Sequence, residues 1–166
     1  MRRSVGRGAE PRSERSRPSA LESRRVEASP ELVALREKTE ALLRRAVADF
    51  RPSGDRFEVP YQGTRLIVHP LDWTRGRTLL RFIAPVVIGV APSPELHARL
   101  SELNNTTIFG KFYVMDGAVW IEHNLLGESV DWEEFRAVLA SVAHHADHLD
   151  DVLIAEFGGR KWSDHA

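Results

Sequence analysis

Residues 103–160 constrain the fold more than any other stretch of this 166-residue chain. Within them, two runs of alternating apolar and polar residues flank the pair Asp116-Gly117. An Asp-Gly pair between two such runs is the strongest short-range signal for a β-hairpin, because both central residues of its turn need positive φ. The sequence therefore predicts a two-residue hairpin loop at this point.

The loop also fixes the register of the two strands. The predicted pairs are Met115–Ala118, Val114–Val119, Tyr113–Trp120, Phe112–Ile121 and Lys111–Glu122. The face that belongs to the core is then formed by Phe112, Val114, Val119 and Ile121. The opposite face carries Tyr113 and Trp120, and amphipathic aromatic surface of this kind is enriched in protein interfaces. A one-residue slip would set apolar against polar positions, so the register is well specified.

A long amphipathic helix is predicted after the hairpin. Asp131 can cap its first turn, and Glu134 three residues later completes the pattern of a capping box. Apolar positions then recur with the period of a helix that is buried along one side: Phe135, Val138, Leu139, Val142, Ala146, Leu149, Leu153 and Phe157. Gly158 and Gly159 end the helix, since glycine adopts the left-handed cap without a steric penalty from Cβ.

The preceding residues predict the rest of an α+β domain. Ser29-Pro30 and Ser93-Pro94 each start a helix, with a capping serine and a proline at the first helical position. Three strand-like runs lie between these helices: 57–61, 64–73 and 77–90. Pro85 interrupts the third run and lacks a backbone N–H, so it predicts an edge strand or a β-bulge. The predicted order is α-β-β-β-α-β-β-α, with a five-stranded, mostly antiparallel sheet and the helices packed against it.

The composition changes sharply near residue 29. Residues 1–29 hold eight Arg and four acidic residues, net +4, and few large apolar side chains, so they are predicted to form a disordered arginine-rich tail. A solvated tail is the favoured interpretation, and electrostatic contact with nucleic acid or anionic lipid is the alternative. A single domain is predicted over residues 30–160, followed by a C-terminal tail at 161–166. The N-terminal tail, residues 1–29, has no apolar run of the length that a signal peptide or a membrane span needs.

The residue types argue against a catalytic site. The chain has no cysteine, which excludes disulfide bonds, thiolate catalysis and cysteine-ligated metals, and fits a reducing cytoplasm. His144 and His148 stand four residues apart on the long helix, a spacing at which two imidazoles can share a metal. They are predicted to face solvent, where the enclosed surroundings that orient metal ligands are missing. A polar helix face is the favoured interpretation, and a metal-dependent enzyme that uses these two histidines is a minor alternative.

Several short motifs resemble a known family: Leu103-Asn104, Gly110-Lys111-Phe112-Tyr113, Trp120-Ile121-Glu122 and the helix end from Leu149-Asp150-Asp151 to Gly158-Gly159. With these motifs, residues 31–160 resemble the actinobacterial YbjN-like domains. Those belong to a wider group, sometimes called the TY-Chap domain, that includes the class I type III secretion chaperones. The resemblance implies an α-β-β-β-α-β-β-α fold, frequently dimeric, and a role in peptide binding or bacterial regulation. It implies no active site.

We therefore expect a non-enzymatic, chaperone-like or regulatory module that binds a peptide or protein client, forms a homodimer and acts in the cytoplasm. No cofactor, metal, nucleic acid or membrane partner is expected. The expected interface consists of Phe109, Tyr113 and Trp120, because a soluble monomer rarely leaves large aromatic patches bare. Alternatively, Tyr113 and Trp120 lie under a loop or terminal segment of the same chain. The alternative is a regulatory domain for sensory transduction, which would hold a small ligand in a pocket between sheet and helices.

Overall fold

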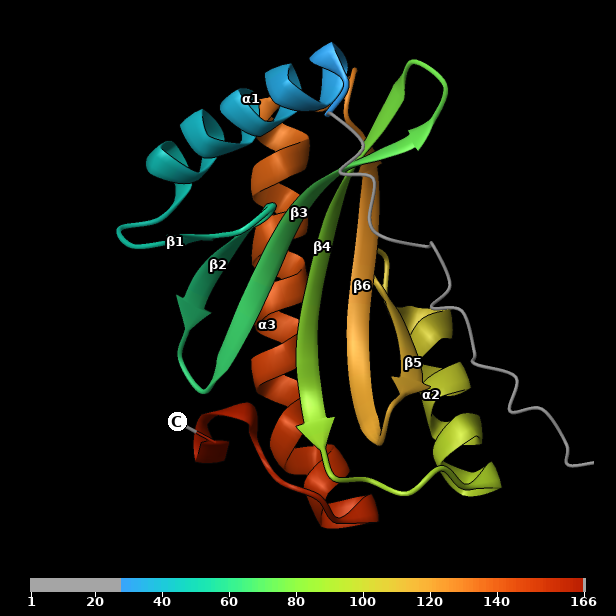
Figure 1. Cartoon of the computed structure of the whole chain (residues 1–166). Helices are drawn as coiled ribbons and strands as arrows, with labels where there is room; N and C mark the ends of the chain where they lie inside the picture. Colours follow the sequence, from blue (N-terminus) through green and yellow to red (C-terminus); the bar gives the residue numbers. More distant parts are fainter. Residues whose placement is uncertain (1–27, 166) are drawn as a thin grey trace, which may run out of the picture.

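The computed structural model describes residues 28–165, which form one sheet and the helices around it (Figure 1). The helices are α1 (Pro30–Ala46), α2 (Pro94–Thr106), α3 (Trp132–Phe157) and the short 3-10 helix η1 (Trp162–His165). The strands are β1 (Arg51–Ser53), β2 (Arg56–Tyr61), β3 (Thr64–Thr74), β4 (Arg77–Ile88), β5 (Lys111–Met115) and β6 (Ala118–Leu126). The predicted tail at residues 1–29 falls almost entirely outside the described residues.

The sheet has six antiparallel strands in the order β1-β2-β3-β4-β6-β5. The α+β class and the antiparallel sheet are confirmed, whereas the predicted count of five strands is wrong. The additional strand, β1, has a proline in its middle and is followed by Gly54, so its sequence is typical of a loop. Pro52 is accommodated because β1 lies at the edge of the sheet, where a missing N–H breaks no ladder.

The hairpin of β5 and β6 has the predicted register at every pair from Lys111↔Glu122 to Met115↔Ala118. Asp116 (φ 51°) and Gly117 (φ 70°) both have the positive φ that the turn requires. The bulge predicted at Pro85 is also confirmed, since the pairing of β4 with β6 shifts between Pro85 and Val87. This proline therefore lies in a central strand, where the bulge accommodates its missing donor.

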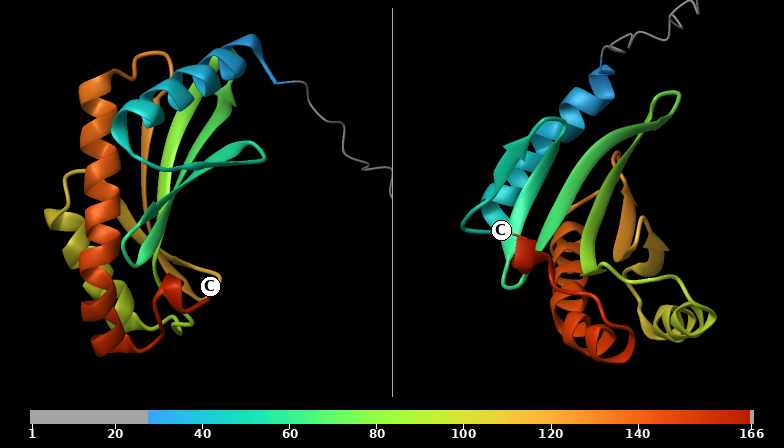
Figure 2. Two further views of the ribbon diagram at one scale, coloured as in Figure 1. Left: turned by 90° about the vertical axis from the view of Figure 1, so that its left-hand side faces the viewer. Right: turned by 60° about the horizontal axis from the view of Figure 1, so that its bottom comes forward.

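The core lies between one face of the sheet and the helices. Figure 2 shows α3 running along that face, with α1 across one end of the sheet and α2 beside β5. The largest fully buried side chains come from β2, β3, β4, β6 and all three helices: Phe57, Phe82, Phe135, Leu43, Leu66, Leu80, Leu96, Ile121, Leu153, Val68, Val86 and Val87. Because all three helices lie on one side, η1 is the only element of residues 28–165 that lies over the opposite face of the sheet (Figures 1 and 2).

The two free edges of the sheet are both protected. Next to β5, the side chain of Asn104 in α2 bonds the backbone of Phe112: its Oδ1 accepts from the Phe112 N–H at 2.6 Å, and its Nδ2 donates to the Phe112 carbonyl at 3.0 Å. This amide takes the place of a neighbouring strand. At the other edge, β1 has three residues, of which the middle one is Pro52. Short or proline-containing edges resist the addition of a further strand.

The predicted helix caps are confirmed, and one of them gives a stability prediction. The Asp131 carboxylate accepts the N–H of Glu134 at 2.8 Å at the start of α3, and Gly158 ends this helix with φ 76°. We expect Asp131→Ala to lower the free energy of unfolding by about 0.5–2 kcal/mol, because it removes the capping acceptor of the longest helix. Urea denaturation measures this change, and Asp131→Asn, which keeps an accepting oxygen, should lose less.

Among residues 28–165, no helix is both long enough and apolar enough to cross a membrane.

Candidate functional site

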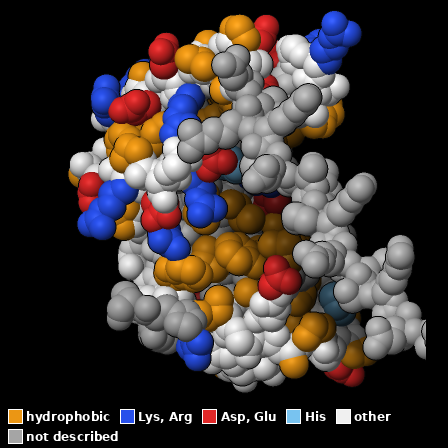
Figure 3. All heavy atoms as spheres, viewed as in Figure 1, with side chains coloured by type: hydrophobic (Ala, Val, Ile, Leu, Met, Phe, Trp, Pro, Cys, Tyr) orange, Lys and Arg blue, Asp and Glu red, His pale blue; other side chains and the backbone are white. Residues whose placement is uncertain are grey.

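The face of the sheet that the helices leave uncovered, called here the open face, is built by the outward side chains of β2 to β6. On β3 and β4, the two central strands of the described sheet, the outward side chains form three cross-strand pairs. Ile67 pairs with Ile83, His69 with Arg81, and Leu71 with Leu79. On β6, the outward residues opposite β4 are Trp120, Glu122, Asn124 and Leu126. Figure 3 shows hydrophobic side chains gathered in a band over these strands.

The band is apolar yet only partly covered. Ile67, Leu71, Leu79 and Ile83 are half-buried, and Leu126 is 44% exposed. Large aliphatic side chains in this state lose their remaining contact with water only if a further segment or molecule covers them, and contiguous patches of this kind mark interaction sites. The open face is therefore the candidate binding surface.

A polar cluster interrupts the band around the carboxylate of Glu122, which is only 8% exposed. The Tyr113 hydroxyl donates to its Oε2 at 2.9 Å, and the Asn124 side-chain amide donates to its Oε1 at 2.7 Å. Arg81 and Lys111 lie 3.6 and 3.8 Å from the same carboxylate. Each oxygen of this buried group thus has a partner, which is the condition under which a charge is tolerated away from water.

The cluster shifts the ionisation of both acids in it. Burial alone would raise the pKa of Glu122, but the hydrogen bonds from Asn124 and Tyr113 and the charges of Arg81 and Lys111 outweigh burial and hold this pKa below its ordinary value of 4.5. Burial, followed by the hydrogen bond to the Glu122 carboxylate, raises the pKa of Tyr113. At neutral pH the cluster therefore contains an ionised glutamate and a protonated tyrosine.

The lowered pKa of Glu122 predicts a pH dependence of stability. A carboxyl group whose pKa is lower in the folded state stabilises the fold above its ordinary pKa, and this contribution disappears as the pH falls through the lowered pKa. We expect Glu122→Gln to be less stable than wild type by about 1 kcal/mol at neutral pH. Urea denaturation at neutral pH and at about pH 3 tests this, because the difference should shrink in acid. A difference that is constant with pH would contradict the prediction.

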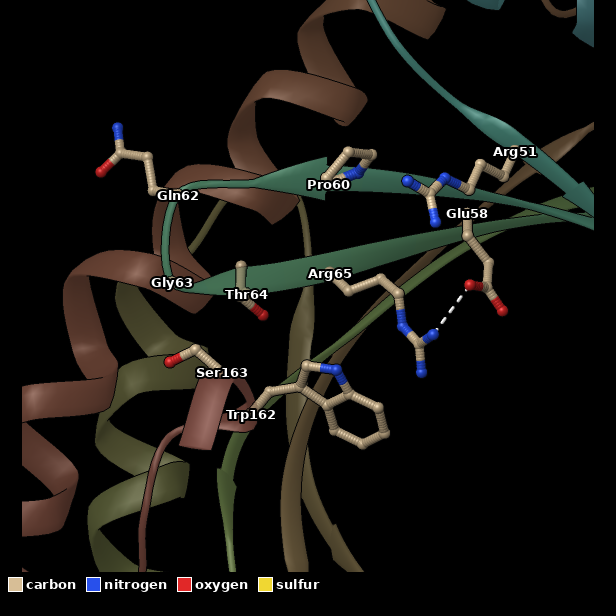
Figure 4. A pocket seen from close by; sticks show the side chains of 9 residues that line it. All are labelled: Arg51, Glu58, Pro60, Gln62, Gly63, Thr64, Arg65, Trp162 and Ser163. Carbon is tan, nitrogen blue, oxygen red and sulfur yellow. Dashed lines mark hydrogen bonds and ion pairs between the residues drawn. The ribbon is translucent and has the colours of Figure 1, made fainter. Parts of the chain in front are cut away.

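A pocket of about 290 Å³ lies at one end of the open face, between the strands and η1 (Figure 4). The Arg65 guanidinium lies 4.5 Å from the centre of the Trp162 ring and donates to Glu58 at 2.7 Å. The Trp162 side chain therefore lines one side of the pocket next to β3, and the side chains of Arg51 and Pro60 line the other side. Trp162 and Ser163, which belong to the C-terminal tail predicted at 161–166, thus contribute to this surface.

The structure brings together two of the three residues predicted to form the interface. Tyr113 and Trp120 are paired on the open face, and the Trp120 indole N–H donates to the Met115 carbonyl at 3.3 Å. Phe109 lies on the helix-covered side instead, with its ring 5.6 Å from that of His123 and its carbonyl accepting from Ser141 of α3. The glycine at 110 (φ 132°) turns the chain between Phe109 and β5, so strand alternation does not extend to this residue.

Among the described residues, the histidines of α3 lie beside one another without a third metal ligand joining them. The rings of His144 and His148 stack with their centroids 5.5 Å apart. The neighbouring carboxylates are engaged elsewhere, since Asp147 accepts from the Gly63 N–H and Asp150 is buried against Lys161. Within residues 28–165, no group of three or more His, Cys, Asp or Glu side chains could hold a metal ion.

The central residues of the open face were not predicted from the sequence: Ile67, Leu71, Leu79, Arg81 and Ile83. A signal for them exists in the sequence. In 64–88, large apolar residues occupy both phases of the strand period, whereas a sheet with one solvated face has apolar residues on one phase only. Apolar residues on both phases of an antiparallel strand indicate that its second face is also covered, either within the domain or by a partner.

Known structures share this arrangement of sheet and helices. The ExsC–ExsE complex matches with a TM-score of 0.56 and 19% identity, over 72% of this chain and 96% of the other. YbjN from E. coli matches with a TM-score of 0.52 and 17% identity, over 73% and 93% of the two chains. No curated protein matches the sequence. The fold is that of the type III secretion chaperones and YbjN, as the resemblance predicted.

The family is shown by the sequence itself. The chain belongs to the family described as T3SS (YopN, CesT) and YbjN peptide-binding chaperone 1, whose model matches residues 34–165. The match includes the whole open face and η1, so every residue of the candidate surface lies inside the family domain.

Proposed function

We propose that this protein is a non-enzymatic, chaperone-like module that binds an extended segment of a partner protein on its open face. The observation that carries the proposal is the band of Ile67, Leu71, Leu79 and Ile83, which the domain's own helices do not cover. Membership of a family described as peptide-binding chaperones supports the same assignment. The protected edges favour binding through the face, because the backbone groups that strand addition would use at Phe112 are already bonded to Asn104.

The experiment that tests this proposal measures peptide affinity with the face intact and altered. Twelve-residue peptides are selected from a displayed random library on the full chain, and the affinity of a labelled selected peptide is measured by fluorescence anisotropy. We expect the double substitution Ile67→Ser with Ile83→Ser to weaken binding about tenfold or more, because the peptide would no longer bury these side chains. The matched control is Val33→Ser, which removes an exposed aliphatic side chain from α1 on the other side of the sheet.

Two outcomes would contradict the proposal. One is a selected peptide that binds the open-face variant as tightly as it binds wild type. The other is a library that yields no peptide with measurable affinity. Thermal denaturation of the variant shows separately whether the fold is intact, so loss of binding and loss of structure are distinguished.

We also infer a homodimer, which would use a different surface from the client. In the loop between α2 and β5, Ile108 is 85% exposed and Phe109 39% exposed, and this loop lies on the helix side of the sheet. Two exposed large apolar side chains in one loop suit an interface between copies. Sedimentation should show a wild-type dimer that Ile108→Ser weakens, while the open-face variant keeps its self-association. A wild-type monomer would contradict the inference.

A further inference from the structure

The open face has a repeated pattern that indicates what kind of segment it accepts. On β3 the outward residues are Ile67, His69 and Leu71, and on β4 they are Ile83, Arg81 and Leu79, in register with the first three. Both strands therefore present apolar, polar and apolar side chains in the same order. Successive outward residues of a strand are about 6.8 Å apart, which is also the spacing of alternate side chains in an extended ligand.

We propose that the open face selects an acidic segment with the pattern apolar-x-acidic-x-apolar, and that Arg81 binds its acidic side chain. This inference rests on the proposed function and names the chemistry of its client. A segment lying along the groove between β3 and β4 would set its two apolar side chains on the isoleucine and leucine pairs. Its acidic side chain would then meet the central row, where Arg81 supplies the donors.

The geometry of Arg81 suits this role. Its polar contacts with Asn124 and Glu122 are long: 3.4 Å from Nε to the Asn124 side-chain oxygen and 3.6 Å to the Glu122 carboxylate. Its side chain is 37% exposed, and no ion pair closer than this is made by Arg81 in the described part of the chain. A guanidinium has five donors in a fixed fork, so one that makes two long contacts retains capacity for a bidentate carboxylate. The Glu122 cluster fixes Arg81 in place without using that capacity.

The charges around the open face favour an acidic ligand. Its outward basic side chains are Arg51, Arg56, Arg65, Arg81 and Lys111. The acidic side chains are fewer: Glu58 and Glu122 on the strands, and Asp55 in the β1–β2 turn, where it lies 3.2 Å from His69. Each of these acids already has a basic or imidazole partner. The basic excess is therefore available to a ligand, and charge complementarity selects an acidic one.

The same charges argue against two other occupants. The arginine-rich residues 1–29, net +4, would place like charges beside Arg81. A second copy docked symmetrically through this face would oppose the same basic patch to itself, since a two-fold interface uses one surface on both subunits. An acidic segment of another protein is the occupant that meets neither difficulty.

Three labelled thirteen-residue probe peptides test the proposal with the full chain. Each carries Ile-Thr-X-Thr-Leu-Thr-X-Thr-Ile between Gly-Ser ends, where X is Asp, Asn or Lys. We expect the Asp peptide to bind wild type about tenfold more tightly than the Asn peptide, and the Lys peptide to bind most weakly. Arg81→Gln should reduce the preference for Asp over Asn to about twofold or less while the Asn peptide keeps its affinity. Arg81→Lys should restore part of the preference.

The control variant is Arg99→Gln, which removes an arginine from α2 on the helix side and should leave the preference unchanged. Equal affinity of wild type for the Asp and Asn peptides would overturn the proposal, as would an undiminished preference in Arg81→Gln. A preference for the Lys peptide would overturn it too, and would point to the chain's own basic tail as the occupant. Failure of all three probes while library-selected peptides still bind would refute the acidic pattern and leave the proposed function standing. If no peptide of any kind binds, both the acidic pattern and the proposed function are refuted.

Discussion

Replacing Phe82 with alanine is expected to lower the free energy of unfolding by about 3–5 kcal/mol. Phe82 lies on the helix side of β4, is fully buried, and packs edge-to-face on Phe135 of α3 with the ring centroids 5.4 Å apart. Truncation would remove this aromatic pair and leave a cavity between the sheet and its longest helix. Urea denaturation with a cooperative transition measures the loss.

The neighbouring Leu79 provides a matched control on the same strand. Its side chain points to the open face and is half-buried, so Leu79→Ala creates no internal cavity and should cost about 1 kcal/mol or less. A Phe82→Ala variant as stable as Leu79→Ala would show that the two faces of the sheet contribute equally to stability. That result would contradict the assignment of one face as core and the other as surface.

The second large effect is expected at Lys161, just before η1. Its ammonium lies 3.1 Å from the carboxylate of Asp150, which is 2% exposed, and 2.8 Å from Asp151. Lys161→Met would leave the buried carboxylate of Asp150 without its cation, and we expect a loss of about 2–3 kcal/mol. Because Lys161 precedes Trp162, the variant should also release η1 from Arg65. Tryptophan fluorescence should then report increased exposure of this ring.

The conservative control is Lys161→Arg, which keeps a cation at this position and should retain most of the stability. The pH dependence has a defined sign. Hydrogen bonding to Asp151, against a smaller opposing effect of desolvation, raises the pKa of Lys161 above its ordinary value of 10.5. A group whose pKa is raised on folding stabilises the fold below its ordinary pKa and loses this contribution as the pH rises through the raised value. The difference between wild type and Lys161→Met should therefore persist at neutral pH and vanish only in strong alkali.

Local signals in the sequence predicted most of the fold correctly. The caps at Ser29, Ser93 and Asp131 accept the backbone N–H groups expected of them, and the Asp116-Gly117 turn fixes the hairpin register. Each of these caps and turns depends on residues within a few positions of one another, so the local sequence is sufficient to predict it. The bulge at Pro85 belongs to the same class, because proline lacks a donor in any context.

Features that depend on distant residues were harder to predict. The strand β1 exists because β2 pairs with it, and the Arg51–Ser53 segment alone has little strand propensity. The open face was missed because the apolar residues on both phases of β3 and β4 do not show by themselves which face the helices cover; that depends on where α1, α2 and α3 pack. Phe109 was misplaced because the glycine after it turns the chain, and this cannot be derived from strand alternation.

The position of β4 in the sheet has a consequence for how the chain emerges during synthesis. β4 pairs with β3, which precedes it directly, and with β6, which is made only after α2 and β5. The longest helix on its buried face, α3, comes later still, and the bridge from Arg160 to Ile88 can form only after α3 has been made. A nascent chain therefore carries the β2–β4 meander with one lateral edge unpaired, its outer face bare and its inner face covered only by α1, until nearly all of the domain has been translated. Such intermediates are prone to aggregate, so we expect the folding yield of this protein to depend on protection of the meander during synthesis.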